Sequence, residues 1–166
     1  MKVLAHGSRR LAILSVGVAA AAGIGPGIAS GESAASLPDP CALLTKVQPE
    51  NTIAKGQAVA VKLGKLVKYG SGSSGSLYCP ETVGKLTVSI TVSHSAGGFG
   101  GVQITSRTHP TGLGSGDELI VGRSPTGAPV DFIAFHTSKA YVSISANGTS
   151  PASLTTLARQ VYALIR

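Results

Sequence analysis

Residues 85–93 read KLTVSITVS. Every second residue of this stretch is apolar, and the residues between them are Lys, Thr or Ser; the apolar ones are Leu86, Val88, Ile90 and Val92. Successive side chains of a β-strand point to opposite faces of the sheet. The alternation therefore predicts a strand with one buried face and one wet face. It is the clearest secondary-structure signal in the chain, and the expected fold is built around it.

Five further segments are predicted to be strands of the same sheet. They cover residues 59–69, 77–79, 119–123, 130–136 and 140–146. The last two are separated by a short polar turn, which predicts a hairpin. Gly64 interrupts the first segment and predicts a bulge or bend there. Residues 96–116 are rich in glycine and are expected to be mostly loop, with one short strand or helix.

Helices are predicted at each end of the folded part. Asp39 can cap a helix that begins at Pro40, and Pro49 then limits or restarts that helix. Ser150 and Pro151 repeat the same start signal near the C-terminus. Apolar residues follow at helical spacing, namely Leu154, Leu157, Ala158, Val161, Leu164 and Ile165. The sequence thus predicts an α+β fold, in which an N-terminal and a C-terminal helix pack on an antiparallel β-sheet.

Residues 1–31 are predicted to be a secretory signal peptide. A basic start is followed by an apolar run at 11–24 and then by small residues; the basic residues are Lys2, Arg9 and Arg10. A membrane anchor is the alternative interpretation. The apolar run is shorter than the roughly 20 residues that a spanning helix needs, so the signal peptide is favoured.

We expect cleavage between residues 31 and 35, then a flexible tether over 32–38 and a single domain over 39–166. Losing the three basic residues of the signal would lower the formal net charge from +7 to +4. A mild positive balance fits contact with anionic envelope polymers, and it fits plain solubility equally well.

Only seven aromatic residues are present, so no stacking platform for nucleic acid is expected. No membrane span is expected after cleavage, and the protein is expected to be secreted, either free or associated with the cell wall.

The chain has two cysteines, Cys41 and Cys79, and both follow the predicted signal. An even cysteine count in an oxidising compartment predicts one disulfide. A two-ligand metal site is the alternative, but no histidine lies near either cysteine in the sequence. We therefore expect the disulfide and no metal.

Two features are candidates for ligand contact. Lys62, Lys65 and Lys68 recur every third residue and form a possible surface for an anionic ligand, although such lysines more often solvate a face or protect an edge strand. Lys62 and Lys68 should share a face of the strand unless Gly64 shifts the register. Phe99, within a run of glycines, is a possible loop contact, or else a core residue that pins the loop.

Catalysis has weak support in the sequence. The predicted mature chain holds three histidines, His94, His109 and His136, with no paired metal-ligand spacing. Acidic residues that could partner them are Asp117, Glu118 and Asp131. No nucleophile elbow of the G-x-S-x-G type and no S-x-x-K motif is present. We therefore assign no catalytic residue, and a small secreted hydrolase using a His/carboxylate pair is the alternative hypothesis.

No cofactor is expected either. Residues 70–75 match the glycine spacing of a dinucleotide-binding loop. That motif needs a helix N-terminus after its third glycine to hold the pyrophosphate. Here the sequence SLYCP follows, which is not a helix start, so the glycines are interpreted as a Ser/Gly-rich loop.

The stretch DPCALLT at 39–45, together with Tyr78-Cys79, the glycine-rich turn at 112–118 and the C-terminal helix, resembles a secreted actinobacterial domain of unknown function. Many members of that family are cell-envelope lipoproteins. The resemblance covers most of residues 37–166, and it implies a compact α+β domain similar to Mog1/PsbP-like sandwiches. It implies no activity and supplies no catalytic residue. The lipidated cysteine of those members is missing here.

Taken together, these observations predict an exported, non-catalytic binding or accessory protein of the bacterial cell envelope. Its expected partner is an envelope polymer or an envelope protein. The patterns do not specify a ligand or an oligomeric state.

Overall fold

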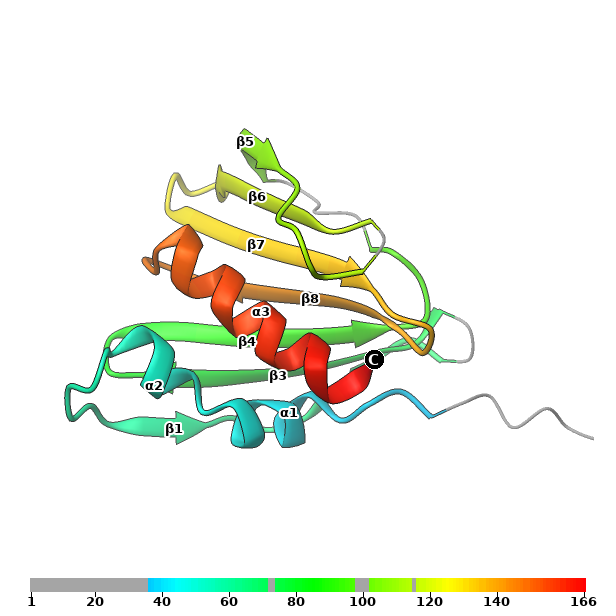
Figure 1. Ribbon diagram of the computed structural model, residues 1–166, viewed down its shortest axis with the longest axis horizontal. Helices are drawn as coiled ribbons and strands as arrows, with labels where there is room; N and C mark the ends of the chain where they lie inside the picture. Colours follow the sequence, from blue (N-terminus) through cyan, green and yellow to red (C-terminus); the bar gives the residue numbers. More distant parts are fainter. Residues whose placement is uncertain (1–35, 72–73, 98–101, 115) are drawn as a thin grey trace, which may run out of the picture. The chain divides into compact units, whose positions relative to one another are not determined.

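The computed structural model describes residues 36–71, 74–97, 102–114 and 116–166, which belong to one folded unit. They form an eight-stranded antiparallel sheet with three helices lying across one of its faces (Figure 1). The predicted α+β fold, with helices from both ends of the folded part packed on an antiparallel sheet, is confirmed. The predicted signal peptide lies outside the described residues.

The strands follow the order β1-β3-β4-β8-β7-β6-β5, and β2 also pairs with β3. Their bounds are β1 Val61–Leu63, β2 Val67–Tyr69, β3 Ser76–Val83, β4 Leu86–Ser93, β5 Gln103–Thr108, β6 Glu118–Arg123, β7 Pro129–His136 and β8 Tyr141–Ala146. The alternating stretch at 85–93 becomes β4, near the centre of the sheet. The predicted hairpin is the β7–β8 pair. Of the short strand or helix expected among the glycines of 96–116, the structure has a strand, β5.

The helices begin at the predicted residues. Asp39 caps α1 (Pro40–Val47), and its carboxylate accepts hydrogen bonds from the N–H groups of Cys41 and Ala42 at 2.8 and 3.3 Å. Pro49 does restart the chain as a separate short helix, α2 (Pro49–Ile53), after a left-handed Gln48. The third helix, α3 (Pro151–Ile165), is capped by Ser150.

The edge strand is bulged at Gly64, as predicted. Leu63 pairs with Glu81, but Val67 pairs with Tyr78, so one extra residue separates β1 from β2. A one-residue offset moves every later side chain to the other face of the sheet. Tyr69 therefore lies on the opposite face from Leu63.

The hydrophobic core lies between the helices and one face of the sheet, which we call the helix face. One cross-strand row shows its composition: Cys79, Ile90, Ile144, Ile133 and Leu119 pair in succession from β3 to β6, and all are buried. Buried residues of the helices pack against this row, namely Leu43, Leu44 and Val47 from α1 and Leu154, Leu157, Ala158, Val161 and Ile165 from α3.

The disulfide predicted between Cys41 and Cys79 is present, and it joins α1 to β3. Because Cys79 is fully buried on the helix face, the cross-link fixes the first helix directly onto the sheet. The described residues contain no helix that is long and apolar enough to cross a membrane.

Candidate functional site

The other face of the sheet, called the open face here, carries hydroxyl and aromatic side chains in cross-strand rows. One row runs from β2 through β3, β4 and β8 to β7. Its members pair in the order Tyr69, Ser76, Ser93, Tyr141 and His136. Two serines thus lie in the middle of the row, with aromatic or imidazole rings on either side.

The next row along the open face repeats this character. Tyr78, Thr91 and Ser143 pair in succession from β3 to β8. The rings of Tyr69 and Tyr78 lie side by side, with 6.4 Å between their centroids. One row further on, the hydroxyls of Ser89 and Ser145 bond to each other at 2.7 Å. The β3–β4–β8 part of the open face is therefore a surface of hydroxyl groups with aromatic rings at its end.

A hollow of about 260 Å³ lies over these two rows, and we call it the hydroxyl pocket. Among the described residues eight line it, and seven of these carry a hydroxyl group. Five belong to the rows, namely Ser76, Ser93, Tyr141, Thr91 and Ser143; the others come from the segments that leave the sheet, at Ser74, Ser95 and Gly97. None of these side chains carries a charge at neutral pH.

Much of the hydrogen-bonding capacity of the pocket is free for a ligand. The hydroxyl of Ser93 donates to the Ser95 carbonyl at 2.7 Å, and that of Ser74 donates to the Ser71 carbonyl at 3.1 Å. The hydroxyls of Ser76, Thr91 and Ser143 have no hydrogen-bond partner among the described residues. Since a hydroxyl group both donates and accepts, the pocket presents both functions within a small area.

Tyr141 is the most buried side chain of the pocket, with 8% of its surface exposed. Its ring packs against His136 with 4.8 Å between ring centroids. Burial, and then the negative charge of Glu118, raise the pKa of its phenol above the ordinary value. Tyr141 therefore stays protonated over the whole physiological range and can donate a hydrogen bond to a ligand.

The three candidate lysines all lie exposed along the bulged edge strand, but not on one face. Lys62 pairs with Thr82 and projects on the open face, whereas Lys68 pairs with Leu77 on the helix face. Lys65 lies in the bulge between them. Gly64 does shift the register, so the lysines form an edge rather than a patch. Their binding of an anionic ligand stays a prediction, and Phe99 lies outside the described residues.

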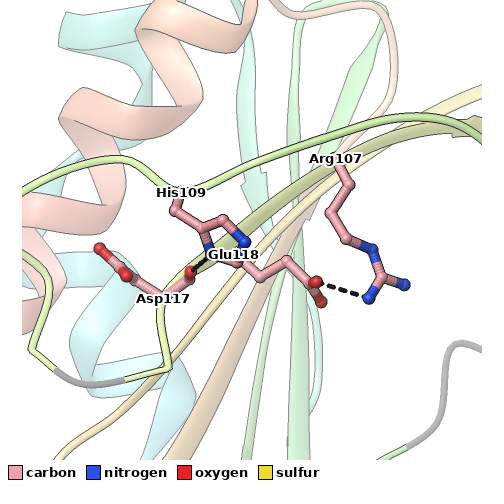
Figure 2. A network of polar contacts seen from close by, with 4 residues as sticks. All are labelled: Arg107, His109, Asp117 and Glu118. Carbon is pink, nitrogen blue, oxygen red and sulfur yellow. Dashed lines mark hydrogen bonds and ion pairs between the residues drawn. The ribbon is translucent and has the colours of Figure 1, made fainter.

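The candidate histidines are not paired with carboxylates within the described part of the chain. The Nδ1 atom of His109 is 2.7 Å from the backbone carbonyl oxygen of Asp117, and the Asp117 carboxylate points away from the ring (Figure 2). Glu118 instead forms an ion pair with Arg107 at 2.8 Å. The hydrolase hypothesis therefore gains no assembled His/carboxylate pair from this geometry.

The remaining candidate acid, Asp131, lies on the helix face of β7 and is 9% exposed. Its burial raises the pKa of its carboxyl group. In the described residues no three His, Cys, Asp or Glu side chains come together in a way that could hold a metal ion.

Sequence reasoning did not find the hydroxyl pocket. Its signal was the polar half of the alternating pattern, Thr91 and Ser93 in β4 and Ser143 in β8, which indicated only a wet face. Comparisons with family models, with curated proteins and with solved structures find no match to this chain.

Proposed function

We propose that this protein is an exported, non-catalytic binding protein of the bacterial cell envelope, and that the hydroxyl pocket binds a neutral, hydroxyl-rich ligand such as a segment of glycan. The observation that carries the proposal is the row of two serines between the rings of Tyr69 and Tyr141. Sugars present hydroxyl groups and apolar C–H faces together, and this row offers a partner for each.

The absence of charge in the pocket supports a neutral ligand. An anionic polymer would be recognised by Lys or Arg side chains, and none lines this pocket. Binding that rests on hydroxyl groups and ring contacts should also change little with added salt, because there is no ion pair to screen.

The test is a titration of the mature chain with N-acetylglucosamine oligomers and with a soluble glucan. Binding is measured by NMR or by calorimetry. Replacing Tyr141→Phe removes the phenol hydroxyl and keeps the ring, so affinity should fall about fivefold, the value of one hydrogen bond. The matched control is Tyr162→Phe. Tyr162 packs edge-on against Phe135 on the helix face, and the change should leave affinity unaltered.

Two results would contradict the proposal. One is binding of neither glycan. The other is stronger binding of an anionic polymer, weakened by salt and by reversing the charges of Lys62, Lys65 and Lys68. In that case the lysines of the edge strand, and not the hydroxyl pocket, would be the binding site.

A further inference from the structure

A second hollow lies on the other side of the sheet, where α1 and α2 meet the edge strand. Its volume is about 340 Å³. Glu81 of β3 lines it from the helix face, opposite Leu63 of β1, and Glu50 of α2 lines it from the helical layer. Two carboxylates from separate elements therefore share one hollow.

One oxygen of each carboxylate is buried without a hydrogen-bond partner among the described residues. Glu81 is 5% exposed, and its Oε2 atom is buried with no hydrogen-bond donor; the same holds for Oε2 of Glu50. A buried carboxylate without a partner is costly, because the charge has lost its water and gained nothing in return. The pKa of Glu81 is raised, first by this burial and then by the negative charge of Glu50.

No cation from the described residues forms an ion pair with either carboxylate of this hollow. Among the described residues the one ion pair is Arg107–Glu118, on the open face of β5 and β6. Of the lysines next to the hollow in sequence, Lys62 projects on the open face and so away from it, and Lys46 lines a separate hollow together with Val47. Within the described residues, therefore, no positive charge neutralises the two carboxylates.

The rest of the hollow is apolar. Leu44 of α1 lines it together with Val61 and Leu63 of β1. The side chain of Val61 is 43% exposed and that of Leu63 is 42% exposed. They are large apolar side chains left in water at the rim of a buried negative charge. The hollow thus matches a ligand with a positive head and an aliphatic stem.

We propose that this hollow binds a primary alkylammonium group, the head group of a lysine side chain or of a free aliphatic amine. The three N–H donors of an ammonium satisfy the two carboxylates, and its methylene stem covers Leu44, Val61 and Leu63. A divalent metal ion is a poorer fit. Calcium takes six to eight oxygen ligands. This hollow offers two carboxylates, and the side-chain oxygen of Gln48 already accepts a hydrogen bond from Asn51 at 3.0 Å.

The test is titration of the mature chain with pentylamine, with a short lysine-containing peptide, with pentanol and with Ca²⁺, monitored by NMR. Pentylamine or the peptide should bind, and pentanol should bind at least about tenfold more weakly, because it has no charge. The ligand that binds more tightly identifies the source of the ammonium group.

The variants are Glu81→Gln and Glu50→Gln, and each should weaken amine binding about tenfold. The control is Glu118→Gln, a carboxylate already paired with Arg107, which should leave binding unchanged. Thermal melting tests whether each variant is folded. If Glu81→Gln does not fold, Glu50→Gln still tests the proposal, because Glu50 is only half-buried. The proposal is overturned if neither amine binds, if pentanol binds equally well, or if Ca²⁺ binds more tightly than either amine.

Discussion

Pro80 occupies an interior position of β3, where a proline is normally excluded because it has no N–H to donate. The structure accommodates it at the bulge. The Pro80 carbonyl accepts from the Gly64 N–H at 2.8 Å, so the missing N–H faces the same edge, where the pairing of β1 and β2 is interrupted. Gly64 fits this place because it has no side chain: a Cβ atom there would lie 2.6 Å from Pro80 Cγ.

We expect Gly64→Ala to destabilise the protein by about 1–3 kcal/mol, since the bulge must shift to admit one methyl group. The measurement is the free energy of unfolding in urea. Gly97→Ala is the matched control, because a Cβ atom at Gly97 meets nothing within 4 Å. Equal stabilities for the two variants would mean that Gly64 does not determine the bulge.

The buried carboxyl group of Asp131 should make the stability of the protein depend on pH. Burial raises its pKa above the ordinary 3.8, so the folded state holds a proton more readily than the unfolded chain. By linkage, stability falls as the pH rises from 3.8 through the folded pKa, and it is then constant. Asp131→Asn should therefore melt at a higher temperature than wild type at neutral pH, with the difference shrinking in acid. A lower melting temperature for the variant at neutral pH would show that the carboxylate is stabilising.

At the scale of the element, α1 and α3 each begin where a short polar side chain, Asp39 or Ser150, accepts hydrogen bonds from backbone N–H groups of the first turn. The Ser150 hydroxyl accepts from the Ser153 N–H at 3.2 Å, and Pro151 follows as the first residue of α3. The strands need their partners in the sheet, but these starts are local. That is why the helix starts could be predicted from two or three residues.

Replacing Ser150→Ala should cost about 1 kcal/mol of stability, the usual value of a helix cap. Ser150→Asp should restore most of it, because a carboxylate also accepts from the first turn and interacts well with the helix dipole. Circular dichroism during thermal unfolding measures both. If the alanine and aspartate variants melt alike, the hydroxyl is not acting as a cap.

On the scale of the whole molecule, the disulfide joins the two layers. Cys41 lies in α1 and Cys79 in β3, 38 residues apart, so the cross-link closes a long loop across the helix–sheet interface. The unfolded chain loses much of its freedom when such a loop is closed.

The double variant Cys41→Ala/Cys79→Ala should therefore lose roughly 4 kcal/mol of stability. The loss should appear as a lower denaturant midpoint, and reduction of the wild-type protein should reproduce it. Unchanged midpoints in both experiments would show that packing alone holds α1 on the sheet.

The sequence by itself determined the fold class, the helix starts, the strand at 85–93, the bulge at Gly64 and the cysteine pairing. These depend on neighbours in the chain, on a period of two or on a count of two cysteines. The signal peptide and Phe99 stay predictions, because they lie outside the described residues.

Only the tertiary structure decided where the polar groups meet. Ser76, Ser93 and Tyr141 come from three strands, and no local pattern shows that they form one row. The burial of Glu81 could not be predicted either, since a glutamate in an alternating strand is normally placed in water. The distribution of Lys62 and Lys68 over two faces depended on a single extra residue in the bulge. Cross-strand register determines each of these features, and register is set by the pairing of segments far apart in the chain.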